Sequence, residues 1–190
     1  MNIDLAKFEE SAKDRRLPLT QKMDRLGESN INCRDCPGEC CTFTSNSMQV
    51  TPIEAIDMMI YLKKQSQYST STFHSLENCI KKYRLDGPTL SNGKKIFMRR
   101  TYTCPFFGGG ELGCTIDPEY KPYGCLAFNP THISFKADSH CHSDKEQLLR
   151  TDEQNVQIHE QLSADLVSSL KLDWEKLPIP VAIVRLWDFL

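Results

Sequence analysis

Nine cysteines in a chain of 190 residues constrain this protein more than any other feature of its sequence. Eight of them fall into two groups. The groups read Cys33-x2-Cys36-x3-Cys40-Cys41 and Cys104-x9-Cys114-x10-Cys125-x15-Cys141. The short C-x2-C spacing lets a tight turn aim two sulfurs at one metal ion, and flanking proline and glycine favour such turns. An odd total also leaves one thiol over in any complete set of disulfides.

The expected compartment argues against disulfides. Residues 1–10 contain neither the basic segment nor the apolar segment of a secretory signal. No apolar run approaches the ~20 residues that a membrane-spanning helix needs. We therefore expect a cytoplasmic protein without a membrane span, in a reducing environment where stable disulfides are rare. Metal ligation explains the eight grouped cysteines better than a mixture of disulfides and buried thiols.

The number of cysteines fits two kinds of metal site. A tetrahedral Zn²⁺ ion and a [4Fe–4S] cluster each take four cysteine ligands, so eight cysteines make two sets, or one set with four thiols left for other work. Cys40 and Cys41 are adjacent, so we expect their side chains to diverge toward two metals, or toward one metal and a neighbouring pocket. The predicted metal ligands are Cys33, Cys36, Cys40, Cys41, Cys104, Cys114, Cys125 and Cys141.

Two features favour an iron–sulfur cluster over zinc. The predicted ligand set is all cysteine, without histidine, and both Cys36 and Cys104 precede a proline, as in cluster-binding loops. Zinc stays the alternative, because zinc sites made only of cysteines are common. His140 and His142 flank Cys141, and either one is a further candidate ligand or a supporting imidazole. Cys79 stands apart from both groups in the sequence, and we expect it to be a thiol of the hydrophobic core.

The order of these motifs resembles a known family. The chain is similar to the small bacterial cysteine-cluster proteins of the YkgJ-like group, which are described as zinc- or iron-chelating. The resemblance covers about residues 33–142 and includes all eight grouped cysteines. Its other elements are the helix start Thr51–Glu54, Cys104-Pro-Phe106, Cys114-Thr-Ile-Asp117, Lys121-Pro-Tyr-Gly-Cys125-Leu-Ala-Phe128.

The chain departs from the family pattern at four places. The first group has three residues, not two, before the cysteine pair, and Asp117, Lys121 and Leu126 stand where the family has tyrosine, arginine and arginine. The arginine pair of the family is therefore not present in this chain, whereas all eight sulfurs are. The family is distantly similar to the flagellin lysine N-methylase, to which an iron–sulfur cluster is attributed. The resemblance thus implies iron–sulfur as readily as zinc.

Helical signals lie on both sides of the first cysteine group. Residues 3–26 predict two short amphipathic helices separated near Leu17-Pro18. Thr51-Pro52-Ile53-Glu54 is a capping box with proline at the first helical position, which predicts a helix to about Lys64. A second helix is expected near Thr72–Arg84, with Gly87 just after it as the residue that stops it.

The remaining elements are short or C-terminal. Asn92-Gly93 predicts a hairpin turn into a strand, and a further strand is expected at His132–Phe135. Ser143–Glu146 predicts a second capping box, followed by a helix with an apolar stripe. The apolar tail 178–190 is expected to dock on the core. The members of the stripe are Val156, His159, Leu162, Leu166 and Leu170.

These elements predict an α+β fold, mostly helical with little sheet, around irregular metal-organised loops. We expect one domain. It comprises an N-terminal helical segment (1–30), a cysteine-cluster metal-binding region (31–142), and a C-terminal helix with its apolar tail (143–190) packed on the same domain. Without metal, the glycine- and proline-rich loops would bury too little apolar surface to offset their ordering entropy.

Three functions fit this sequence. The first is a metal-binding protein that holds an iron–sulfur cluster, zinc or both through eight cysteines, without turnover. The second is an iron–sulfur-dependent methyl- or electron-transfer enzyme, although no recognisable methyl-donor site is present. The third is a metal-stapled interaction module whose C-terminal tail contacts a protein partner. The formal net charge of −2 gives no reason to expect nucleic acid as a partner.

Overall fold

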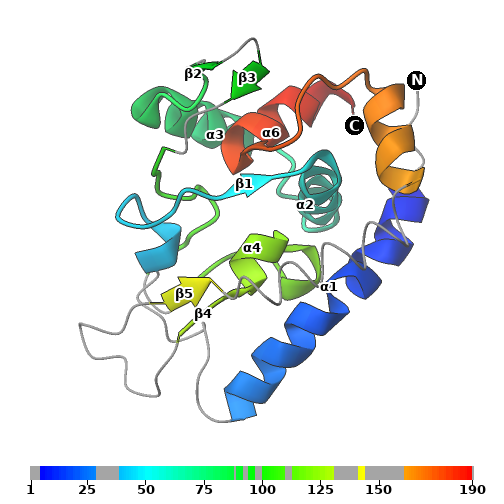
Figure 1. Ribbon diagram of the computed structural model, residues 1–190, viewed down its shortest axis with the longest axis vertical. Helices are drawn as coiled ribbons and strands as arrows, with labels where there is room; N and C mark the ends of the chain where they lie inside the picture. Colours follow the sequence, from blue (N-terminus) through cyan, green and yellow to red (C-terminus); the bar gives the residue numbers. More distant parts are fainter. Residues whose placement is uncertain are drawn as a thin grey trace.

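The computed structural model describes residues 5–28, 39–87, 89–91, 94–96, 100–109, 113–130, 141–143 and 161–189. The described part is mostly helical, as predicted, with a few short strands (Figure 1). A helical segment at 161–169 precedes the C-terminal elements. The elements are α1 (Leu5–Glu28), η1 (Glu39–Cys41), β1 (Gln49–Val50), α2 (Pro52–Lys64), α3 (Thr70–Tyr83), β2 (Thr89–Ser91), β3 (Lys94–Ile96), η3 (Pro118–Tyr120), α4 (Tyr123–Leu126), β4 (Phe128–Pro130), β5 (Cys141–Ser143), β6 (Leu177–Pro178), α6 (Ile179–Leu186) and η4 (Trp187–Phe189).

Helix α2 lies at the centre of the fold, between α1 on one side and α3 with α6 on the other (Figure 1). Its start is the predicted capping box: the Thr51 amide donates to Glu54 Oε2 at 2.8 Å, and the Glu54 amide donates to Thr51 Oγ1 at 3.4 Å. Every residue from Pro52 to Ile60 is buried. A helix buried on all sides is a core helix, and the predicted bounds of α2 are confirmed.

The N-terminal segment forms one helix, so the predicted break near Leu17-Pro18 is wrong. Proline inside a helix removes one backbone hydrogen bond and crowds the preceding turn. Helix α1 continues through Pro18 because residues on both sides of it, including Ala12 and Leu19, are buried against α2, η3 and α4. Burial of this face offsets the cost of placing proline inside the helix. Tertiary packing therefore keeps α1 continuous through Pro18.

Helix α3 agrees with the predicted helix near Thr72–Arg84 to within two residues at either end, but the residue that stops it is not the predicted one. Its N-cap is Ser69, whose Oγ accepts from the Thr72 amide at 3.3 Å. The helix stops at Tyr83 because Arg84 adopts a left-handed conformation with φ of 53°. Gly87, the predicted stop, lies three residues further on, outside the helix. A left-handed arginine at this position carries no local sequence signal, since glycine or asparagine is the usual choice.

The described strands form three antiparallel pairs, β1 with β6, β2 with β3, and β4 with β5. In the second pair Ser91 lies opposite Lys94, which confirms the predicted hairpin, although its turn residues lie outside the described part. In the third pair Pro130 lies opposite Cys141. The predicted strand at His132–Phe135 also lies outside the described residues.

The C-terminal tail is docked, as predicted. Helix α6 buries Ile179, Ala182 and Ile183 against α2 and α3. Leu166 and Leu170 of the predicted apolar stripe are buried in the same core. Val156, His159 and the predicted capping box at residues 143–146 fall wholly or partly outside the described structure. Among the described helices, none combines the length and apolarity needed to cross a membrane.

Candidate metal centre

The structure describes the side chains of five of the eight predicted ligands. Cys33 and Cys36 lie outside the described residues, and Cys141 is placed only as the first residue of β5. The structure assigns no disulfide to Cys79 or to the five described ligands. The five are Cys40, Cys41, Cys104, Cys114 and Cys125.

The two cysteine groups, far apart in the sequence, adjoin in space. The Cys104 amide donates to the Cys41 carbonyl oxygen at 2.8 Å. The contact continues on either side: the Tyr102 amide donates to Asn46 O at 2.9 Å, and the Phe43 amide donates to Thr103 Oγ1 at 3.1 Å. The backbone of the first group therefore adjoins the backbone of the second group at Cys41 and Cys104.

Within the second group, Cys104 and Cys114 lie on the two arms of one loop. The arms are joined because the Thr115 amide donates to Phe106 O at 2.9 Å and the Gly108 amide donates to Gly113 O at 2.8 Å. Burial raises the pKa of the Cys104 thiol to about 12, and the neighbouring Cys114 and Cys79 contribute to the increase.

Cys125 belongs to the same neighbourhood. Its pKa lies well above the ordinary value because the thiol is buried, and Cys104 and Cys114 contribute to the increase. Thiolates in such a setting need a nearby positive charge, because burial disfavours the charged form. A bound cation would supply that charge, and binding would release the thiol protons.

Cys40 and Cys41 do not diverge as expected from their adjacency. Their Sγ atoms are 4.0 Å apart. With a Zn–S bond of about 2.3 Å, two sulfurs on one tetrahedral ion stand ~3.8 Å apart. In a [4Fe–4S] cluster each cysteine ligates a different iron, which places the sulfurs further apart. The observed spacing therefore fits two ligands of one ion.

The described side chains do not complete a metal site by themselves. No three or more histidine, cysteine, aspartate or glutamate side chains within the described ranges are grouped closely enough to hold an ion. A four-sulfur site around Cys40 and Cys41 therefore needs ligands whose side chains are outside those ranges. Cys33, Cys36 and Cys141 are predicted ligands of this kind.

Cys79 is a core thiol, as predicted, but it lies beside the second cysteine group. Its side chain is buried in the hydrophobic core, and its Sγ donates to Thr103 O at 3.4 Å. Burial raises the pKa of the Cys79 thiol to about 11. Cys79 is far from both groups in the sequence, so the sequence did not predict that it lies near Cys104. Helix α3 places Cys79 beside Thr103, the residue that precedes Cys104.

A buried charge cluster lies next to the cysteine loops, and the sequence did not predict it. The side chains of Arg15, Arg16 and Asp57 are fully buried. Arg15 Nη2 donates to Asp57 Oδ1, and Arg16 Nη1 lies 2.8 Å from Asp57 Oδ2 at ion-pair distance without hydrogen-bond geometry. Charged residues are rarely buried unless paired. The available signal was Asp57, an acid between the apolar residues Ile56 and Met58 in the middle of α2.

The charge cluster contacts the segment that leads to Cys125. Arg16 Nε donates to Lys121 O at 2.6 Å, and Arg15 Nε donates to Tyr123 Oη at 3.1 Å. Glu54, besides capping α2, accepts a hydrogen bond from the Tyr123 amide at 2.9 Å. Residues of α1 and α2 thus hold the backbone at both ends of the short segment 121–123.

Comparison with models of protein families, with curated proteins and with solved structures found no match for this chain. The similarity to the YkgJ-like group therefore rests on the motif residues, and it stays a prediction.

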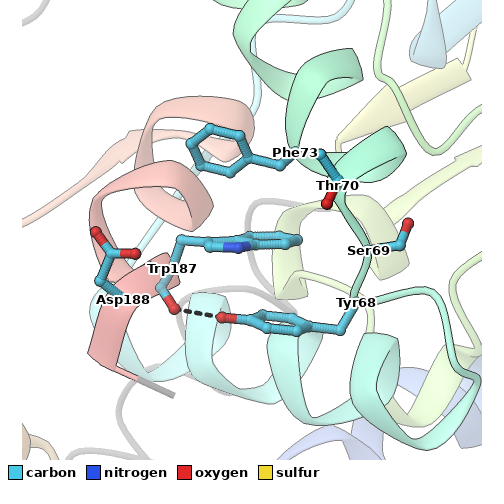
Figure 2. Close-up of a pocket in the computed structure, with 6 residues that line it drawn as sticks. All are labelled: Tyr68, Ser69, Thr70, Phe73, Trp187 and Asp188. Atoms are coloured by element: carbon cyan, nitrogen blue, oxygen red, sulfur yellow. Dashed lines mark hydrogen bonds between the residues drawn. The ribbon is translucent and has the colours of Figure 1, made fainter.

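A pocket of about 370 Å³ lies at the start of α3 (Figure 2). Trp187 stacks on Tyr68 with ring centroids 4.0 Å apart, and Phe73 tilts against it at 5.2 Å. Tyr68 Oη also donates to the Trp187 carbonyl oxygen. Figure 2 shows the indole between the two other rings, so these rings fasten the C-terminal turn to α3.

Proposed function

We propose that this protein binds metal through its grouped cysteines, without catalytic turnover. The observation that carries the proposal is the distance between Cys40 Sγ and Cys41 Sγ, which is 4.0 Å. This is the spacing of two ligands on one tetrahedral ion. The full proposed ligand set is Cys33, Cys36, Cys40, Cys41, Cys104, Cys114, Cys125 and Cys141.

The pair Cys40 and Cys41 supports a single ion such as Zn²⁺ in the first group. Bound there, a cation would hold both thiols as thiolates and link η1 to the loop of Cys104, which is already hydrogen-bonded to Cys41. The iron–sulfur cluster predicted from the sequence stays a candidate for the second group, where Cys104 and Cys114 influence the pKa of Cys125. As described, these three side chains are not grouped closely enough to hold a metal without further ligands.

Metal analysis of protein purified without oxygen tests the proposal. We expect bound metal in the wild type, less metal in Cys41→Ser and Cys125→Ser, and wild-type content in Cys79→Ala. The last variant is the matched control, because Cys79 is a described thiol near the same loops but outside the proposed ligand set. Protein without metal, with all thiols open to alkylation while the chain is folded, would refute the proposal.

The absorption spectrum separates the two metals. Zn²⁺ has a filled d shell and gives a colourless protein, whereas iron–sulfur charge transfer gives a brown one. Zinc that is lost in both Cys40→Ser and Cys41→Ser is the result expected from the 4.0 Å sulfur spacing. Iron and sulfide in stoichiometric amounts, lost in these same two variants, would contradict the single-ion assignment of the pair.

A further inference from the structure

The N-terminal helix contributes directly to the surroundings of Cys125. Arg15 and Arg16 cross from α1 to contact Tyr123 Oη and Lys121 O, and both are held by Asp57 of α2. The Arg16 guanidinium also lies 5.0 Å from the centre of the Tyr123 ring. Side chains from two helices therefore converge on the residues immediately before Cys125.

The contacts to this segment fix its backbone as well as its side chains. Lys121 O accepts from Arg16, and the Tyr123 amide donates to Glu54 Oε1. The next turn follows directly, because the Cys125 amide donates to Pro122 O at 3.0 Å. Since the backbone on both sides of Pro122 is held, the direction in which α4 presents Cys125 is held too.

The opposite side of this turn is closed by Met48. A Cβ atom added to Gly124 would lie 2.6 Å from Met48 Sδ, so the end of the Met48 side chain packs directly against this turn and would have to shift to admit a larger residue. Met48 O in turn accepts from Tyr102 Oη at 2.7 Å, two residues before Cys104. The turn that carries Cys125 is thus fitted between the charge cluster and the segment that brings Cys41 to Cys104.

If the charge cluster only stabilised the fold, apolar residues of similar size could take its place. Buried ion pairs are often replaced by apolar residues without loss of stability. Here the charges make directional hydrogen bonds to a main-chain carbonyl oxygen and a tyrosine hydroxyl, which apolar residues could not make. Groups that orient metal ligands through hydrogen bonds affect metal affinity even though they do not touch the ion.

We propose that Arg15, Arg16, Asp57 and Glu54 are positioning residues that orient Cys125 for metal binding. The proposal rests on the function proposed above, in which Cys125 is a ligand. It gives α1 a role in the metal centre, whereas the sequence alone assigns residues 1–30 to a helical segment outside the metal-binding region 31–142. Cys125 remains the ligand, and the four residues act through the backbone of 121–123.

Two conservative variants test the positioning role. In Glu54→Gln the glutamine side chain has one acceptor oxygen where glutamate has two. The backbone amide of either Thr51 or Tyr123 would then face the side-chain NH₂ group and lose its acceptor. Arg16→Lys keeps a positive charge near Asp57 but loses the planar fork that reaches Lys121 O and Ala12 O together. Ser69→Ala is the matched control, since it removes the N-cap hydrogen bond of α3 and no contact that the described structure gives the charge cluster.

The main measurement is Zn²⁺ affinity, by competition with a chromophoric chelator on protein shown to be folded by circular dichroism. We expect Glu54→Gln and Arg16→Lys to bind about tenfold or more weakly. The affinity of Ser69→Ala should stay within about twofold of that of the wild type despite its lower stability. Variants that lose stability but keep wild-type affinity would overturn the proposal. Wild type without metal affinity would instead refute the proposed function.

A second measurement does not depend on metal. In metal-free folded protein, we expect Glu54→Gln and Arg16→Lys to change the alkylation rate of Cys125 at least about threefold, with Cys79 as the internal reference. Cys79 is held by Thr103 O and does not contact the charge cluster in the described structure. Unchanged Cys125 reactivity in both variants would show that the cluster does not position this thiol.

Discussion

Replacing Asp57 with asparagine measures how much the buried charge cluster contributes to the stability of the fold. Asp57 is fully buried and is the described acid that faces both Arg15 and Arg16. The asparagine side chain would keep the shape of the aspartate and one acceptor oxygen, but it would leave two guanidinium groups in the core without a negative charge.

The expected loss of stability in Asp57→Asn follows from the burial of the charges. Removing one partner of a buried ion pair costs about 3–5 kcal/mol, because the remaining charge is not compensated. Arg15 keeps its bond to Tyr123 Oη, and Arg16 keeps its bonds to Ala12 O and Lys121 O. We therefore expect a loss of ~3 kcal/mol, a large share of the roughly 5–15 kcal/mol that usually separates folded from unfolded protein.

Urea unfolding followed by circular dichroism gives the free energy of unfolding for each variant. Glu9→Gln is the control, because the Lys64–Glu9 ion pair has both side chains 43% exposed and should contribute less than about 1 kcal/mol. Added salt should reduce the effect of Glu9→Gln and leave that of Asp57→Asn unchanged. An Asp57→Asn loss below ~1 kcal/mol, or one removed by salt, would refute the argument.

Three further predictions concern single side chains. Thr51→Ala should lower the free energy of unfolding by ~1 kcal/mol in urea titrations, because the cap of α2 is lost; no loss would contradict the cap. Tyr102→Phe should cost about 1–3 kcal/mol for each group left unpaired, since Tyr102 Oη donates to Met48 O and accepts from the Ile179 amide; a neutral effect on unfolding would contradict this. Burial raises the pKa of the Cys79 thiol from 9.0 to about 11, so its contribution to stability is complete below pH 9 and is lost as pH rises to 11. The advantage of wild type over Cys79→Ala in unfolding experiments should therefore shrink across that range, and a constant difference would contradict the shift.

The elements that could be predicted from the sequence are those specified by neighbouring residues. Helix α2 was predicted from Thr51, Pro52 and Glu54, all within one turn, and its bounds agree with the structure. The hairpin of β2 and β3 was predicted from the dipeptide between them. In both cases the residues that determine the structure are close in sequence, so local patterns are sufficient.

The elements that were not predicted depend on distant partners. Helix α1 continues through Pro18 because α2, η3 and α4 cover it, and a sequence window contains none of these. Arg15 and Arg16 look like exposed residues until Asp57 is placed beside them, 42 residues away in the case of Arg15. Likewise, the spacing of Cys40 and Cys41 depends on side-chain rotamers, which adjacency in sequence does not fix.

The side chain of Glu54 makes both a local contact that the sequence predicted and a long-range contact that it did not. One carboxylate oxygen, Oε2, caps α2 through a motif that the sequence displays, and the other, Oε1, accepts from the Tyr123 amide 69 residues away. The start of the central helix and the turn that carries Cys125 are therefore held by the same carboxylate. Because the first contact fixes the glutamate in place, the second can be directional. The cysteine turn is thereby tied to the most buried helix of the fold by protein contacts alone, and a bound metal ion would add to an arrangement that α1 and α2 already support.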